Sequence, residues 1–313
     1  MPDAVELVDA IGKAAGSYPG HRAAHAKGVV LAGKFTPSDG ASALTRAVHF
    51  TGAPSRVTVR FSNGGANPDS NDAEVGDGRG MATKFYLPDG PRTDIVALSL
   101  PCFFVRTPED FVRFTRAGKP LPFGGLPGPR FPLFLLGHRE AIPATRAFMA
   151  LKPPASYASC RYNGIHSFKW TDREGGERWV RYSWLPEAGE ESIDGGEAKR
   201  RGRDYLQEEI RARLEREPAR FTLLLQLAAE SDPIDDPTAV WPEGRETVEA
   251  GTLELTGLEE GREQGDDILV FDPTRVTDGI ETSDDPILHF RSRAYSVSIE
   301  LRSGVPRPPE LDA

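Results

Sequence analysis

Arg291 and Tyr295, four residues apart near the C-terminus, are the pair in this chain best suited to chemistry. Asp285-Pro286 before them predicts a helix start, with an N-cap aspartate and proline at the first helical position. On such a helix Arg291 and Tyr295 share a face. A guanidinium beside a phenol favours the phenolate, because a nearby positive charge stabilises the anion. A phenolate is an anionic oxygen ligand suited to ferric haem iron. The plainer alternative is a surface Arg–Tyr pair.

A histidine and a polar strand face form a second candidate group. His25 precedes a strand-like run, and a histidine that titrates near neutral pH can act as general acid and base for a peroxide. It could equally be a turn histidine whose ring is satisfied. Arg60 and Ser62 lie two apart on a predicted strand, Val57–Ser62, so they share a face. An inward Arg60 needs an anionic partner, either a haem propionate or a buried aspartate. Ser62 could accept a hydrogen bond from the histidine ring.

Three phenylalanines follow Pro101 at short spacing: Phe103, Phe104 and Phe111. Each one separately is typical of ordinary core packing. As a set they could also line a dry pocket over a flat cofactor.

Composition excludes several classes of protein. The chain has 313 residues and a net charge of -9, with Lys and Arg spread along its length, so we expect no nucleic-acid partner. The longest apolar runs, such as residues 221–229, are too short to span a bilayer, so we expect no membrane partner. The N-terminus lacks the pattern of a signal peptide. Two cysteines, Cys102 and Cys160, make neither a disulfide framework nor a metal site, which favours the cytoplasm.

The periodicity of apolar residues predicts about eight strands joined mostly by short turns. Residues 3–17 and the charged stretch 195–217 are expected to be helical, and residues 105–155 read as an excursion from the core. Turn residues predict hairpins around 88–91 and 172–176. We therefore expect a single domain over residues 1–313, an α+β fold built on an antiparallel barrel. The expected strands are Val29–Phe35, Val57–Ser62, Met81–Leu87, Ile95–Leu100, Phe168–Thr171, Arg178–Trp184, Phe221–Ala228 and Gly251–Gly257.

A set of short motifs resembles the haem catalases in order and spacing across about residues 18–302. Each motif alone is weak, but so many in one order make a specific signal. The chain resembles the short, catalase-related peroxidase branch, because it stops soon after the tyrosine and lacks the wrapping segments and C-terminal domain of full-length catalases. The motifs are Arg22 with His25-Ala-Lys-Gly28, Val59-Arg-Phe-Ser62, Arg79-Gly-Met-Ala-Thr-Lys-Phe-Tyr86, Pro101-Cys-Phe-Phe-Val-Arg106, Asn163-Gly-Ile-His-Ser-Phe168, Val240-Trp-Pro242, Phe271-Asp-Pro273 and Arg291-Ser-Arg-Ala-Tyr295.

The resemblance implies the catalase-type eight-stranded antiparallel barrel with added helices, haem b as cofactor, and a role for each matching residue. His25 is similar to the distal histidine over the iron, and Ser62 to its hydrogen-bond partner. Tyr295 is similar to the axial ligand of the metal, and Arg291 to the residue that stabilises its phenolate. Further matches are the propionate-binding arginines Arg22, Arg60 and Arg302, the distal-pocket phenylalanines Phe103 and Phe111, and Ala24, where a pocket valine is common.

One departure from the family pattern affects the expected activity. Full-length catalases carry a Gly-Asn-Asn-Thr-Pro stretch whose first asparagine helps to orient peroxide, and Leu98 stands at that position here. Leucine cannot form the hydrogen bond, and Ser99 is expected to face the other side of the strand. Loss of one oriented hydrogen bond costs about 1–3 kcal/mol, or roughly ten- to a hundredfold in rate. Oxidation of a second H2O2 should suffer most, and a more apolar pocket would suit organic hydroperoxides.

These features predict a haem peroxidase that reduces organic hydroperoxides and H2O2 with one-electron donors. Three alternatives stay open: a true catalase of low activity, a haem-binding or haem-sensing protein without turnover, and a fatty-acid hydroperoxide isomerase. The retained His25 argues against pure binding, and Leu98 argues against the isomerase, which keeps a polar partner there. We also expect a homo-oligomer, a dimer rather than a tetramer, and no bound NADPH.

Overall fold

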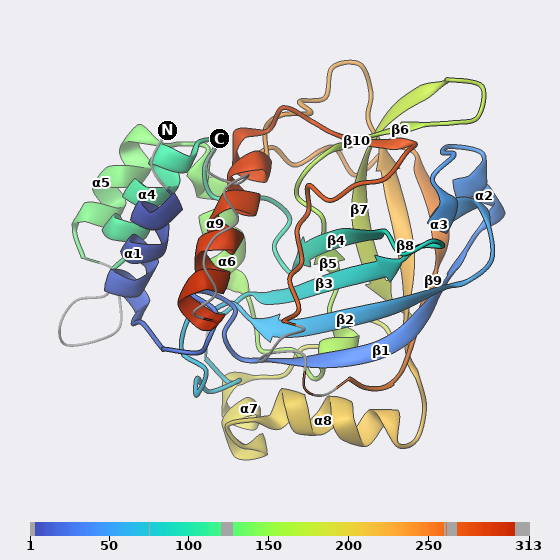
Figure 1. Cartoon of the computed structure of the whole chain (residues 1–313). Coiled ribbons are helices and arrows are strands. Elements are labelled where there is room, and N and C mark those ends of the chain that lie inside the picture. Colours follow the sequence, from blue (N-terminus) through green and yellow to red (C-terminus); the bar gives the residue numbers. More distant parts are fainter. Residues whose placement is uncertain (1–3, 75, 120–127, 260, 262–267, 304–313) are drawn as a thin grey trace.

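The computed structural model describes residues 4–74, 76–119, 128–259, 261 and 268–303, with side chains as far as residue 300. Its centre is one antiparallel sheet that closes on itself, with helices on the outside (Figure 1). The strands are β1 (Gly28–Pro37), β2 (Ser55–Asn63), β3 (Arg79–Tyr86), β4 (Arg92–Leu98), β5 (Tyr162–Asn163), β6 (Phe168–Thr171), β7 (Glu177–Pro186), β8 (Ala219–Leu227), β9 (Thr247–Leu258) and β10 (Ile280–Thr282).

The sheet forms an eight-stranded barrel with a two-stranded extension. Its order is β10-β6-β7-β5-β4-β3-β2-β1-β9-β8, and an additional β7–β8 pairing closes the ring from β7 to β8. Strands β6 and β10 continue outward from β7. The predicted antiparallel barrel is therefore confirmed, and closure leaves the barrel strands without free edges.

Large side chains fill the barrel interior. Phe35 is fully buried, and its ring centroid lies 5.3 Å from Phe85 and 6.0 Å from Trp184. Phe61 meets Phe221 in the same core, with ring centroids 5.8 Å apart. Burial of each such phenylalanine contributes roughly 2–3 kcal/mol. The barrel is thus a rigid scaffold, and the cavity described below lies on its outer side.

Local turn chemistry sets the two predicted hairpins. Asp89 and Gly90 both have positive φ, 63° and 99°, in the tight turn between β3 and β4. Gly175, with φ 89°, takes the same role between β6 and β7. Asp172 Oδ1 accepts hydrogen bonds from the backbone N–H groups of Glu174 and Gly176 and so supports the second turn.

The longest helix, α9 (Pro286–Ser303), packs beside the barrel against α1 (Ala4–Ala15) and α4 (Pro108–Ala117) (Figure 1). A small apolar cluster joins these three helices, with Leu7 and Val8 from α1, Val112 from α4, and Phe290 and Val297 from α9. The predicted N-terminal helix and the predicted helix start at Asp285-Pro286 are both confirmed. The helices α5 (Arg130–Gly137) and α6 (Ala141–Ala150) belong to the predicted excursion.

Three expectations differ from the structure. The strand Val57–Ser62, expected to be half-buried, is buried on both faces, because one face lines the barrel and the other the cavity. The charged stretch 195–217 holds two helices, α7 (Gly195–Arg201) and α8 (Tyr205–Leu214), separated at Gly202, where φ is 103°. The short strands β5 and β10 were not predicted. The remaining elements are α2 (Asp39–Ser42), α3 (Val48–Thr51) and the 3-10 turn Tyr157–Ser159.

Within the described part of the chain, none of the helices has the length and apolar character that crossing a membrane requires.

Candidate active site

A cavity of about 220 Å³ lies between α9, α1, the segment before β1 and the outer face of β2, β3 and β4. Most of its wall is apolar, with Leu7, Val8 and Ile11 contributed by α1. It brings together the candidate residues with described side chains that the family resemblance named, whereas Phe104, the third phenylalanine of the predicted cluster, is not part of its lining. These residues are Arg22, Ala24, His25, Arg60, Ser62, Leu98, Phe103, Phe111, Arg291 and Tyr295. The side chain of Arg302 lies outside the described residues.

His25 and Ser62 form the first polar group in the cavity. His25 Nδ1 lies 3.0 Å from Ser62 Oγ, as the sequence predicted. Burial, together with the positive charges of Arg60, Arg291 and Arg22, lowers the pKa of His25 to about 3. The ring is therefore neutral at physiological pH and able to accept a proton.

The backbone at His25 is strained and firmly held. Its φ is 57°, a left-handed conformation that costs a non-glycine residue on the order of 1–3 kcal/mol. The N–H of His25 donates to the carbonyl of Gly64, and that of Ala26 to the carbonyl of Gly65. Arg60 donates from its two terminal nitrogens to the carbonyls of His25 and Ala26, at 2.9 and 3.1 Å. These bonds fix the direction of the histidine ring.

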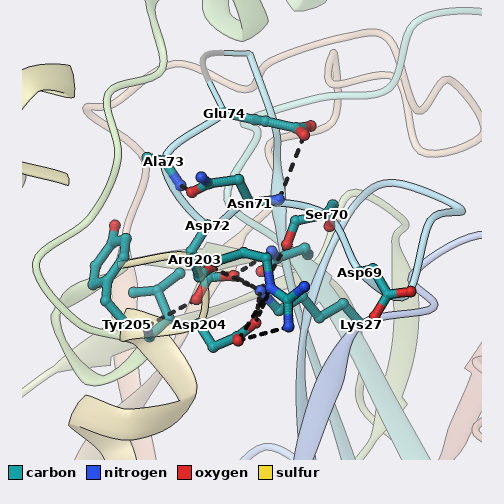
Figure 2. Close-up of polar contacts among 12 residues, drawn as sticks. Lys27, Asp69, Ser70, Asn71, Asp72, Ala73, Glu74, Arg203, Asp204 and Tyr205 are labelled. Carbon is teal, nitrogen blue, oxygen red and sulfur yellow. Dashed lines mark hydrogen bonds and ion pairs between the residues drawn. The ribbon is translucent and has the colours of Figure 1, made fainter. Parts of the chain in front are cut away.

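Lys27, two residues further on, anchors the same segment through a group of oxygen contacts (Figure 2). Its buried Nζ lies 2.6 Å from Asp72 Oδ1 and 2.8 Å from Asp204 Oδ1. It also donates to the carbonyls of Ser70 and Arg203, at 2.7 and 2.9 Å. Four oxygen partners satisfy the buried ammonium, and the lysine ties the His25 segment to the loop before β3 and to the start of α8.

Glycine at position 80 makes room for the histidine. A Cβ there would lie 2.7 Å from Ser62 Oγ and 3.0 Å from His25 Nδ1, too close for any side chain. Leu98 pairs with Gly80 across β3 and β4 and also lines the cavity. Ser99 does not replace the missing polar group, because its Oγ accepts a hydrogen bond from the N–H of Arg79. As expected, Leu98 faces the cavity and Ser99 is not part of its lining.

Arg291 and Tyr295 form the second polar group, one turn apart on α9. Arg291 Nε and a terminal nitrogen donate to the phenol oxygen of Tyr295, at 2.9 and 2.6 Å. Two charge-assisted hydrogen bonds stabilise negative charge on that oxygen. The pair lines the cavity rather than the outer surface, so the simple surface pair considered above is wrong.

Two buried residues extend this pair into a chain of hydrogen bonds. Arg291 Nη1 lies 3.0 Å from His166 Nε2, and His166 Nδ1 lies 2.6 Å from Asp285 Oδ2. An arginine can only donate, so His166 Nε2 accepts and Nδ1 carries the proton that is donated to Asp285. Burial lowers the pKa of His166, as do Arg291 and Arg181, against the opposing effect of Asp285. A neutral His166 fits this assignment.

Asp285 has two roles that the sequence revealed only in part. Its Oδ1 accepts from the backbone N–H groups of Ile287 and Leu288 at 2.8 and 3.3 Å, which confirms the predicted N-cap. Its Oδ2 holds His166. The motif Asn163–Phe168 contained His166, but no role followed from spacing alone, since the two residues are 119 positions apart.

Comparison with known proteins identifies the family. The family model described as Catalase matches residues 5–307, nearly the whole chain. The chain belongs to the catalase family. Two relatives named catalase-related peroxidase are close to it in length. The one from Mycolicibacterium paratuberculosis is 42% identical and covers 96% of this chain and 95% of its own. The one from Synechococcus elongatus is 32% identical and covers 95% and 88%.

Larger members of the catalase family share the same core. The catalase of Vibrio cholerae is 29% identical over 96% of this chain, which spans 62% of that protein. The crystal structure of a fungal catalase superposes with a TM-score of 0.80 and 25% identity, covering 92% of this chain and 61% of its own. The barrel and α9 therefore correspond to the core of a full-length catalase.

Members of the catalase family are haem enzymes, and the cavity fits that group. Its largely apolar wall suits a flat macrocycle. Tyr295 offers a phenol oxygen that accepts hydrogen bonds from Arg291, and Arg22 and Arg60 supply positive charge at the cavity wall. Arg22 donates to the carbonyl of Leu269 at 2.8 Å. Among the described residues no cluster of His, Cys, Asp and Glu could hold a metal without haem.

Proposed function

We propose that this protein is a haem b peroxidase that reduces organic hydroperoxides and H2O2 with one-electron donors and has weak or no catalase activity. The observation that carries the proposal is the pair of polar groups in one apolar cavity: His25 with Ser62, and Tyr295 with Arg291. Bound haem would supply the redox centre that takes two oxidising equivalents from a peroxide and returns them to donors one at a time. Tyr295 would be its axial ligand, and Arg22, Arg60 and Arg302 would hold its propionates.

His25 would move the peroxide proton from the inner to the outer oxygen. Ser62 engages Nδ1, which leaves Nε2 as the nitrogen that exchanges the proton. A pKa of about 3 keeps His25 neutral, so the ring can accept the peroxide proton. The protonated ring would be a strong acid, which favours transfer of that proton to the leaving oxygen. Carboxylates of a bound haem beside Arg22 and Arg60 would offset part of the positive charge that lowers this pKa.

Tyr295 and its partners would hold the iron of a bound haem. Arg291 donates two hydrogen bonds to the phenol oxygen, and that oxygen, as ligand, would supply electron density to the iron of a bound haem. His166 and Asp285 hold the guanidinium in place, because the neutral His166 accepts from Arg291 and donates to Asp285. The guanidinium of Arg291 is therefore held between Tyr295 and His166.

In this proposal Leu98 is the residue that favours peroxidase over catalase activity. The wall beside His25 offers an apolar side chain where a second H2O2 molecule would need a hydrogen bond to be oriented. Oxidation of one-electron donors would not require this hydrogen bond, so Leu98 would leave it unaffected. We further propose a homodimer as the working form.

The test compares two reactions of the haem-loaded protein in parallel. One assay follows O2 release from H2O2, and the other follows dye oxidation driven by tert-butyl hydroperoxide. The proposal predicts strong dye oxidation and little O2. In His25→Ala, haem stays bound and dye oxidation falls by at least a hundredfold, in line with the loss of a general acid–base group.

Two results would overturn the proposal. Vigorous O2 release by the wild-type protein would make it a small catalase in spite of Leu98. Tightly bound haem with neither activity would indicate a haem-binding protein without turnover.

A further inference from the structure

Helix α5 is apolar but has no buried residue among its eight. Its sequence is Arg-Phe-Pro-Leu-Phe-Leu-Leu-Gly, and Leu133 and Leu136 are 69% and 76% exposed. These two leucines lie three apart, so they present one apolar face to solvent. In Figure 1, α5 lies at the outer edge of the group of helices beside the barrel, with its neighbour α4 further in. A contiguous apolar face of this kind marks an interaction surface.

Unpaired positive charge surrounds this helix. Residues 106–152 contain eight Lys and Arg against three Asp and Glu, in a chain whose net charge is -9. Lys119 follows α4, Arg130 begins α5 and Arg139 follows it; all three are exposed, and none has an ion pair or hydrogen bond with a described residue.

The nearby acidic side chains are already engaged and do not neutralise these cations. Asp110 binds Arg113 and Thr107, and Glu140 binds His138. The ring of His138 in turn stacks on Phe134 of α5, with centroids 4.1 Å apart. The surface of α5 is therefore apolar at its centre and cationic around it.

A line of aromatic rings connects α5 with the cavity. Phe114 of α4 contacts Phe131 and Phe134 of α5, with ring centroids 5.5 and 5.8 Å apart. Phe114 stacks on Phe104 at 4.7 Å, and Phe104 contacts the cavity-lining Phe103 at 5.9 Å. An apolar molecule taken up at α5 would thus remain near apolar surface on its way to the cavity.

Charge decides between two possible occupants of this surface. In a two-fold dimer through α5 each copy would present the same face, so the unpaired Arg130 and Arg139 would meet like charges across the interface. An anionic bilayer complements both features at once, because the leucines enter the acyl boundary while the cations meet the headgroups. The expectation of no membrane partner rested on the lack of an apolar run long enough to span a bilayer, whereas docking at a bilayer surface needs no spanning segment.

We propose that α5 is a docking site for anionic lipid bilayers, with Leu133 and Leu136 inserting and Lys119, Arg130 and Arg139 binding headgroups. The substrate class that follows is membrane-borne lipid hydroperoxides, and this second statement rests on the proposed peroxidase function. The bilayer would deliver the substrate beside the aromatic line that leads to the cavity.

The binding test uses the haem-loaded protein and sedimentation with large vesicles. One set is phosphatidylcholine alone, and the other contains one part phosphatidylglycerol to two parts phosphatidylcholine. Binding is expected only to the second set and should weaken in high salt, which screens headgroup attraction. Arg130→Gln with Arg139→Gln lowers the partition coefficient roughly 30-fold, at about fivefold for each cation. Leu133→Gln with Leu136→Gln lowers it by at least tenfold.

Two control variants change matched residues elsewhere. Val240→Gln removes an exposed apolar side chain, 54% exposed, and Arg173→Gln removes an exposed cation in the turn between β6 and β7. Both should bind vesicles as the wild type does. Failure of the wild type to bind anionic vesicles overturns the docking proposal. So does equal loss of binding in the controls, or a drop in solution mass in the leucine variant, which would make α5 a contact between copies.

A second readout separates docking from catalysis. Wild type and both α5 variants should oxidise dye equally with soluble tert-butyl hydroperoxide, whereas with hydroperoxide carried in anionic vesicles the variants should be at least tenfold slower. Equal rates on vesicles, in spite of lost binding, would contradict delivery by docking. Loss of wild-type activity on the soluble peroxide would instead contradict the proposed function and leave the binding result standing.

Discussion

At the scale of single residues, Leu98 has the clearest effect on the expected reaction. It lies opposite Gly80 and closes the cavity wall near His25 with an apolar side chain. We predict that Leu98→Asn raises O2 release from H2O2 by roughly tenfold or more, because an amide can orient the second peroxide. Oxygen-electrode rates measure this change. Leu98→Met, of similar volume and without an amide, is the control, and an equal gain in that variant would contradict the argument.

Gly80 gives a test of the His25–Ser62 geometry. A methyl group at this position would displace either the histidine or the serine, since it would lie within 3.0 Å of both. Gly80→Ala should therefore bind haem and lose at least tenfold in peroxide-driven dye oxidation. Gly78→Ala is the matched control, because its added Cβ would meet nothing closer than Ser99 Oγ at 3.9 Å. Normal activity in Gly80→Ala would show that the close packing is not needed.

The sequence motifs included the cavity residues but gave no indication of the distant residues that hold them in place. His25, Ser62, Arg291 and Tyr295 line one cavity, and each of them belongs to a short local pattern of the sequence. The anchoring of Lys27 by Asp72 and Asp204 depends on a contact between segments 177 positions apart, between Lys27 and residue 204. No periodicity or spacing predicts such a contact.

At the scale of elements, α9 depends on Asp285 for both its start and its chemistry. Asn caps a helix about as well as Asp does, whereas Ala does not. We predict that Asp285→Asn keeps the thermal midpoint within a few degrees but lowers dye oxidation, since His166 loses its charged acceptor. Asp285→Ala should lose the same activity and also about 1 kcal/mol of stability. Urea denaturation and activity of the two variants measure the two effects. Equal stability of both variants would contradict the capping role.

The long elements followed from local signals, and the short ones did not. The hairpin turns at Asp89-Gly90 and around Gly175 and the N-cap at Asp285 each have a residue type that the backbone requires. Strands β5 and β10 have two and three residues and form only because neighbouring strands pair with them. Gly202 ends the first of the two helices in the stretch predicted as one helix, 195–217. The charged residues on both sides of it are typical of a solvated helix, so the sequence pattern alone did not predict the break.

At the scale of the whole molecule, closure of the barrel buries neutral histidines. Burial lowers the pKa of His49, enclosed by Phe50 and Phe85, from 6.5 to about 3. Between about pH 3 and pH 6.5, His49 therefore binds a proton in the unfolded chain but not in the native protein. Stability is therefore greatest above about pH 6.5 and decreases as the pH falls toward 3.

We predict that His49→Phe reduces this loss of stability. Each such histidine contributes at most about 1.4 kcal/mol per pH unit, so the wild type should lose up to roughly 2 kcal/mol more than the variant between pH 6.5 and 5. Urea denaturation of the haem-free proteins at both pH values measures it. The same pH dependence in both proteins would mean that His49 is not a buried neutral group.

The strand count predicted a barrel, but it did not predict which strands pair to close it. The pairings β1–β9 and β7–β8 join segments that no turn connects in sequence, and only the packing of the closed core selects them. The extension through β6 and β10 follows from the same packing.

The most direct test of the account is the absorbance spectrum of the purified protein and of Tyr295→Phe, each supplied with equal haem. Arg291 and Tyr295 lie in hydrogen-bond contact on the cavity wall, and phenylalanine keeps the ring while removing the oxygen. The account predicts tightly bound ferric haem with a phenolate-type spectrum in the wild type, and weak or no haem in the variant. An unchanged ferric spectrum and haem content in Tyr295→Phe would contradict the axial role of Tyr295, and with it the proposed mechanism.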